Sequence, residues 1–219
     1  MGTKKILLLG LIGFAAACAS NTQHGELSLA ETTARIENSS AMSVREAFRS
    51  SQVLKAGSFG RTVELLPDAA PVVVIDQAKT LSAPFVLDSR GSGRLVVKSY
   101  PTSVGNAGSL FYPIVSIVDD DYSIRATLKP KYEFNFASNT LTNEFTLPPN
   151  ARFILIHTSP EYFKYSFGET AGNRLSPGAT AVGGVIGGAL GFALFSALST
   201  SGSPAFSLGP AGKIQVDVE

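Results

Sequence analysis

The sequence lacks tryptophan and contains one cysteine, Cys18, among its 219 residues. A lone cysteine excludes an intramolecular disulfide, so the fold depends on its core and its hydrogen bonds. Charged residues make up only 16% of the chain and the formal net charge is +1. This balance gives no electrostatic basis for binding nucleic acid. The low charge, together with 21 glycines and 14 phenylalanines, is typical of a β-rich domain.

Histidine is nearly as scarce, and only His24 and His157 could serve as general bases near neutral pH. No G-x-S-x-G, H-E-x-x-H, phosphate-loop or dinucleotide-binding motif occurs. Residues 119–121 are three aspartates, but their neighbours do not supply the six or more oxygen ligands that calcium requires. We therefore expect no enzymatic activity, no metal site and no cofactor. His157 is interpreted as a histidine at a strand end, and residues 119–121 as a hairpin turn.

The first 17 residues predict a secretory signal peptide. Two lysines precede an apolar run, and small residues lead to Cys18. Residues 15–18 (AAAC) resemble a lipobox, in which the cysteine is lipidated and becomes the first residue of the processed chain. An ordinary signal peptide cut at an A-x-A site is the alternative. Since Ala19 is not the aspartate associated with inner-membrane retention, we expect a periplasmic lipoprotein anchored to the outer membrane through Cys18.

After the leader, residues 18–42 are polar and small and have no sustained periodicity, which predicts a tether. A short helix is predicted over residues 43–56. Its start is marked by Ser43 and Glu46, which have the spacing of a capping box, and apolar residues then follow on one helical face. The folded domain is expected over residues 43–219.

The rest of the chain has the periodicity of strands. Residues 71–76 (PVVVID) are nearly all apolar and predict a strand buried on both faces. Residues 83–87 and 93–100, separated by a turn-forming cluster, predict a hairpin. Residues 213–219 (KIQVDVE) alternate between apolar and polar and predict a final strand. Further strands are expected at 111–118, 122–128, 143–147 and 152–158. About eight short strands with little helix predict a mainly β fold, an antiparallel β-sandwich, with a closed barrel as the alternative.

Tyrosines are the candidate residues for binding carbohydrate, because sugar rings stack on aromatic faces. Tyr100 and Tyr112 flank a loop at 101–110 that is rich in glycine, serine and asparagine. Tyr162 and Tyr165 are close together downstream. The alternative is that these four side chains pack in the core and at the rims of strands.

Three segments are similar to the maltose operon periplasmic protein family. They are residues 82–87 (SAPFVL), residues 111–115 (FYPIV) with Asp119 and Tyr122 following, and Leu147-Pro148 leading to FILIHT at 153–158. The resemblance covers about residues 70–170 and the terminal strand. It implies a periplasmic, mainly β protein that is associated with uptake of maltose and maltodextrins. It implies no enzymatic activity and supplies no catalytic residues.

The chain departs from that family in a glycine-rich insertion at 175–212, which contains no charged residue. Residues 178–198 are long enough to cross a bilayer as a helix. Gly183, Gly187 and Gly191 recur every fourth residue and would give such a helix a smooth contact face. This spacing resembles glycine-zipper segments of outer-membrane lipoproteins.

We expect the insertion to be a helical excursion that rests in a membrane or self-associates; packing on the sandwich and a true span are the alternatives. A span is disfavoured because it would separate the last strand from its sheet. The sequence therefore leaves two functions open. One is a lipoprotein that assists carbohydrate binding or transport. The other is a structural or assembly lipoprotein that forms homo-oligomers or contacts a membrane protein through this segment.

Overall fold

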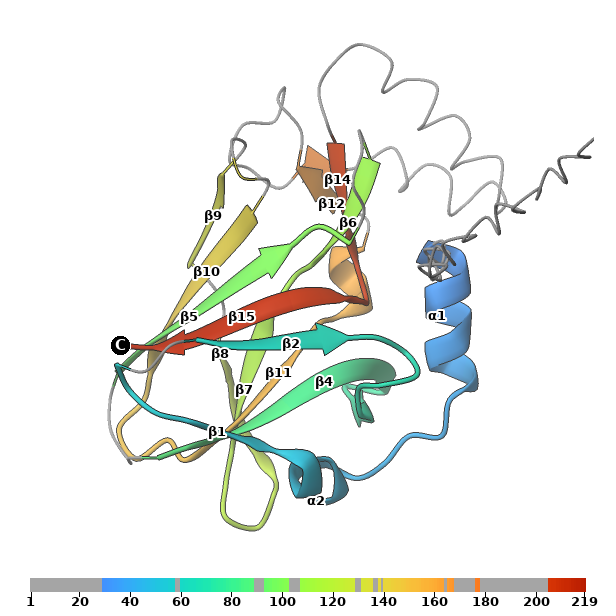
Figure 1. The fold of residues 1–219 in the computed structure, drawn as a ribbon. Coiled ribbons are helices and arrows are strands. Elements are labelled where there is room, and N and C mark those ends of the chain that lie inside the picture. The colour runs from blue at the N-terminus through green and yellow to red at the C-terminus, as the bar shows by residue number, and fades with distance from the viewer. Residues whose placement is uncertain are drawn as a thin grey trace, which may run out of the picture.

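The computed structural model describes residues 29–57, 60–88, 93–102, 107–128, 131–135, 138, 140–163, 165–167, 176–177 and 205–219. These residues form three sheets and two short helices, so the prediction of a mainly β fold is confirmed (Figure 1). The described strands are more numerous than the eight that were expected.

The first sheet has six strands in the order β1 (Gln52–Leu54), β4 (Ala78–Leu87), β11 (Phe153–His157), β7 (Ile114–Val118) and β8 (Ile124–Leu128), with β3 (Val72–Ile75) paired to β4. Strand β1 runs parallel to β4, and the other pairs are antiparallel. Strands β7 and β11 are buried along their whole length, which places this sheet against the core.

The second sheet has five strands, all antiparallel, in the order β2 (Arg61–Leu65), β15 (Gly212–Val218), β5 (Gly93–Tyr100), β10 (Thr140–Leu147) and β9 (Lys131–Asn135). Strand β15 confirms the predicted C-terminal strand. In this strand Ile214 and Val216 are fully buried, whereas Lys213 is exposed, as the alternating sequence predicts.

A third, smaller sheet has the order β13 (Ser176–Pro177), β12 (Tyr165–Phe167), β14 (Ala205–Gly209) and β6 (Ala107–Phe111). Strands β14 and β6 pair in parallel. Two of these strands lead directly into the larger sheets, since β6 precedes β7 and β14 precedes β15. The third sheet therefore lies at the same end of the two larger sheets (Figure 1).

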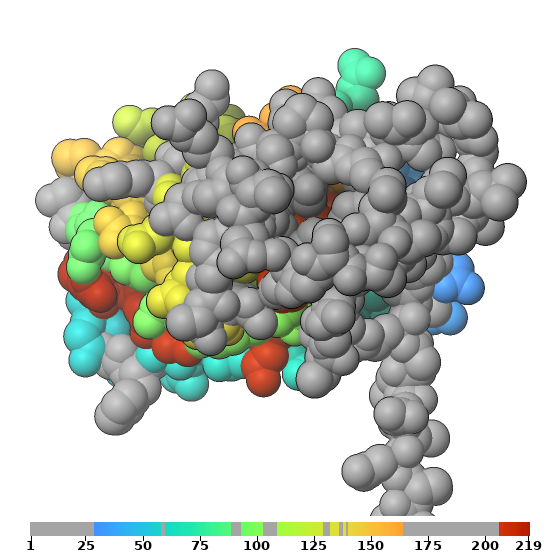
Figure 2. Space-filling model, turned by 90° about the horizontal axis from the view of Figure 1, so that it is seen from above, coloured from blue at the N-terminus to red at the C-terminus, as the bar shows by residue number. Residues whose placement is uncertain are grey.

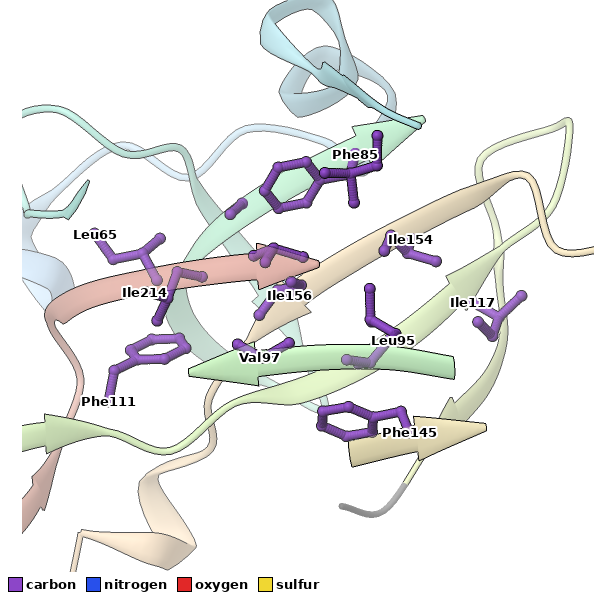
Figure 3. Packing of buried hydrophobic residues seen from close by; sticks show 14 of the residues in the cluster. Leu65, Phe85, Leu95, Val97, Phe111, Ile117, Phe145, Ile154, Ile156 and Ile214 are labelled. Carbon is purple, nitrogen blue, oxygen red and sulfur yellow. The ribbon is translucent and has the colours of Figure 1, made fainter. Parts of the chain in front are cut away.

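The main core lies between the first and second sheets. Leu95, Val97 and Ile214 of the five-stranded sheet belong to the same buried cluster as Ile154 and Ile156 of β11, and these side chains point toward one another in Figure 3. Burial of each such aliphatic side chain contributes about 1.5–3 kcal/mol to folding. A second cluster, around Tyr112 and Phe206, lies beneath the third sheet.

Helix α1 (Leu29–Asn38) corrects the prediction of a structureless tether over residues 18–42. Its Ile36 is buried in the main core, and Lys79 of β4 donates hydrogen bonds to the carbonyls of Glu37 and Ser39 at its end. The helix was missed because only two of its residues, Thr32 and Ile36, are buried. Seen from above in Figure 2, α1 (blue) lies at one side of the molecule and β9 and β10 (yellow) toward the other.

The predicted helix over 43–56 begins where expected but is much shorter. Ser43 and Glu46 form both hydrogen bonds of the capping box, at 3.2 and 2.9 Å. Helix α2 (Val44–Ala47) continues as a 3-10 turn, η1 (Phe48–Ser50), and the chain then enters β1. Pairing with β4 buries Leu54 in the core, and this tertiary contact prevails over helix extension.

Three strand predictions are also corrected. The segments at 83–87 and 93–100 do not form a hairpin, because they lie in β4 and β5 of different sheets. The segment at 111–118 divides into β6 and β7, with Pro113 between them lacking the N–H that a continuous strand would need. Strand β3 is not buried on both faces, because Val74 is 51% exposed.

Several predicted features fall outside the described residues. They include the signal peptide, Cys18 and the glycine face formed by Gly183, Gly187 and Gly191. Of the segment at 175–212, only residues 176–177 and 205–212 are described. They form β13, β14, the two residues that join β14 to β15, and the first residue of β15. Within the described part of the chain, the helices are too short and too polar to cross a membrane.

Candidate functional site

A cleft of about 380 Å³ opens at one end of the six-stranded sheet. Its walls come from the turn between β3 and β4, from β7 and β8, and from the segment after β11 that includes the 3-10 turn η2 (Pro160–Tyr162). The volume is at the lower end of the range of about 300–1,000 Å³ that small-molecule pockets occupy. Its polar lining side chains include Asp76, Thr80, Thr127, His157, Thr158 and Glu161.

The turn between β3 and β4 brings Asp76 to the cleft. Asp76 and Gln77 have φ angles of 49° and 68°, so both residues of this two-residue connection are left-handed. Such turns match the twist of paired strands, and aspartate tolerates this conformation better than most residues because its short side chain can bond locally. The carboxylate of Asp76 is exposed at the cleft wall as a result.

His157 ends β11, as the sequence predicts, and the residue is 97% buried beside the cleft. Nδ1 lies 3.1 Å from the carbonyl oxygen of Thr158, and Nε2 lies 2.8 Å from the hydroxyl of Ser116. Because a carbonyl only accepts, Nδ1 carries the proton and Nε2 accepts from Ser116. Burial lowers the pKa of His157, so the ring is neutral at pH 7.

The hydrogen bonds continue from Ser116 to Thr127, whose hydroxyls are 3.2 Å apart. The Ser116–His157 pair does not have the geometry of a hydrolase triad. Ser116 is fully buried and does not line the cleft, so a substrate in the cleft would not reach its hydroxyl, and the position of an orienting carboxylate at Nδ1 is taken by a backbone carbonyl. The pair is best explained as a network that fixes the wall of the cleft.

Two threonines complete the buried side of the cleft. Thr80 donates to the carbonyl oxygen of Thr158 at 3.1 Å, which joins β4 to the end of β11. The hydroxyl of Thr158 itself is buried and makes no hydrogen bond within the described part of the chain. Buried polar groups are nearly always bonded, so this hydroxyl is an exception in the lining of the cleft.

The structure brings together two of the four tyrosines that the sequence suggests for sugar contact. Tyr112 is buried, and its ring stacks on Tyr162 with centroids 4.4 Å apart and planes at 28°. Burial raises the pKa of the Tyr112 phenol, and the neighbouring phenols of Tyr162 and Tyr132 add to the effect. Tyr162 is half-buried and lines the cleft, whereas Tyr112 does not.

The other two tyrosines lie elsewhere. Tyr100 is on β5 of the second sheet, where its hydroxyl donates to Oε1 of Gln215 at 3.0 Å. Tyr165 is in β12, and its side chain is not among those described. Sequence reasoning missed Tyr132, which packs edge-on against Tyr112 at 6.1 Å. The alternating order of residues 131–135 (KYEFN) is the signal that could have identified its strand.

No protein-family model matches the chain, and no curated protein matches it. The resemblance to the maltose operon periplasmic protein family therefore stays a prediction. In the residues that the structure describes, there is no group of three or more His, Cys, Asp or Glu side chains that could hold a metal ion.

Proposed function

We propose that this protein is a non-enzymatic envelope lipoprotein whose β-sandwich domain binds carbohydrate and assists its transport. The observation that carries the proposal is the cleft at the end of β11, where Tyr162 meets several hydrogen-bonding side chains. Tyr162 is one of the four tyrosines that the sequence suggests for sugar contact. The packing of two sheets over one core supports the sandwich architecture.

The chemistry of the cleft is suited to a sugar. A sugar ring presents an apolar face to an aromatic ring and hydroxyl groups around its edge. The Tyr162 ring is held in place by stacking on the buried Tyr112, which reduces the conformational entropy lost on binding. Asp76 and Glu161 supply carboxylate acceptors for sugar hydroxyls, and Ser159 supplies a further hydroxyl. The small volume favours a mono- or disaccharide unit.

The envelope address is supported by the leader and the lipobox-like residues 15–18. Metabolic labelling with palmitate tests it directly. We expect label in the native protein and none in Cys18→Ser. Label retained by Cys18→Ser, or an unlabelled native protein in the soluble fraction, would contradict lipid anchoring.

Isothermal titration with maltose, maltotriose and cellobiose tests the binding function. Loss of an aromatic contact removes about 1 kcal/mol, so we expect Tyr162→Ala to weaken binding about fivefold or more. Tyr100→Phe is the matched control, because it changes a tyrosine hydroxyl on the second sheet away from the cleft. Absence of binding to every sugar, together with unchanged sugar uptake in a deletion strain, would refute the proposal.

A further inference from the structure

The charged groups around the cleft are of one sign. Asp76 and Glu161 are exposed carboxylates, and no lysine or arginine is among the described residues that line it. Neither carboxylate forms an ion pair with a described residue. The imidazole of His157 is engaged at both nitrogens, to Ser116 and to the Thr158 carbonyl, and so adds no free donor.

A second feature of the same cleft is a buried hydroxyl. Thr158 is 98% buried in the wall, and its side-chain hydroxyl has no partner among the described residues. A hydroxyl can accept as well as donate, so a ligand that carries donor groups would satisfy it. The carboxylates can only accept hydrogen bonds, whereas this hydroxyl can donate or accept, so a ligand that carries donor groups can satisfy all three.

We propose that the cleft selects a cationic, amine-bearing ligand, which for a carbohydrate means an amino sugar. This inference rests on the proposed binding function and adds a preference of the cleft for positively charged ligands. A protonated amine carries only hydrogen-bond donors. Its hydrogen bonds to carboxylates are charge-assisted and therefore stronger than those that a neutral hydroxyl group forms with the same carboxylates. Two like charges in the lining of a cleft concentrate cations and repel anions such as sugar phosphates.

Titration of the full chain with glucosamine, glucose and glucose 6-phosphate at low ionic strength tests the preference. We expect glucosamine to bind about five- to tenfold more tightly than glucose, and glucose 6-phosphate to bind more weakly than glucose. The advantage of glucosamine should shrink in 0.5 M salt, because exposed charges are screened.

The double variant Asp76→Asn/Glu161→Gln should bind glucosamine and glucose equally. The matched control is Glu64→Gln/Asp88→Asn, which removes two exposed carboxylates that do not line the cleft and should keep the preference. Circular dichroism of both variants checks that each is folded before titration.

The outcomes separate the two proposals. Equal binding of glucosamine and glucose by the native protein overturns the charge preference and leaves carbohydrate binding intact. Binding of a non-sugar amine such as ethanolamine without any sugar, lost in Asp76→Asn/Glu161→Gln, supports the charge preference and overturns the carbohydrate function. Binding of none of these probes overturns both.

Discussion

Replacing Asn143 with leucine should stabilise the protein, although Asn143 is fully buried. Its side chain lies on the inner face of β10 between Leu141, which belongs to the cluster around Tyr112 and Phe206, and Phe145, which belongs to the main core. Neither the oxygen nor the nitrogen of its amide has a partner within the described residues. Burying an amide without a hydrogen bond is costly, because the amide gives up its bonds to water.

The expected gain follows from three terms. A buried polar group without a hydrogen bond costs about 1–3 kcal/mol, and Asn143→Leu removes that penalty. Burying a leucine side chain contributes about 1.5–3 kcal/mol. The larger side chain strains its neighbours by about 1–3 kcal/mol, which offsets much of the gain. We expect a net increase of about 1–2 kcal/mol in the free energy of unfolding, or a few degrees in Tm.

Urea unfolding at pH 7.5 measures this difference. Asn143→Asp is the contrasting variant, because a buried carboxylate without a partner should lower stability strongly. Ser99→Ala on the neighbouring strand removes another buried hydroxyl without a described partner and should be neutral or slightly stabilising. The reasoning is refuted if Asn143→Leu lowers the free energy of unfolding by more than about 1 kcal/mol, since the amide would then have to be bonded.

Further measurements test other parts of the structure. Because the pKa of His157 is lowered by burial, native stability should be intact above pH 6.5 and fall below it, by up to about 1.4 kcal/mol per pH unit. His157→Gln should remove this slope in urea unfolding, and an unchanged slope would show that another group titrates. Gly212→Ala would place a Cβ 2.9 Å from the Cβ of Phe111, so thermal unfolding should show a loss of about 1–3 kcal/mol; an unchanged Tm would mean the sheets can move apart. If the glycine-rich segment drives self-association, cross-linking of the native protein should give oligomers that Gly187→Leu/Gly191→Leu reduces, whereas identical patterns would remove that alternative.

Local signals predicted local structure well. The capping box at Ser43 marks the start of α2, and the alternation of residues 213–219 gives the buried face of β15 correctly. In both cases the information lies within a few residues of the feature. Connections between strands were predicted less well. The sequence predicts a hairpin at residues 83–100, but β4 and β5 belong to different sheets. Which sheet a strand joins depends on distant residues that local periodicity does not report.

In the candidate site, too, local features could be predicted from the sequence and long-range contacts could not. Tyr162 could be selected because aromatic clustering is visible in the sequence. Asp76, Thr80 and Thr158 could not, since β3, β4 and β11 are brought together only by sheet pairing. The left-handed turn that exposes Asp76 also lacks the Asn-Gly or Asp-Gly sequence that usually marks such turns.

The central position of β15 constrains the order in which the protein can fold. β15 forms the ladder between β2 and β5, yet both neighbours precede it by more than a hundred residues in the chain. Until the ribosome has passed Val218, β2 has no partner in that sheet, and a chain emerging in sequence cannot complete the main core. Pairing over such separations is slow because the intervening loop must close first. The five-stranded sheet therefore assembles only after β15 has been synthesised, so truncation before Gly212 should leave β2 unpaired and the core open.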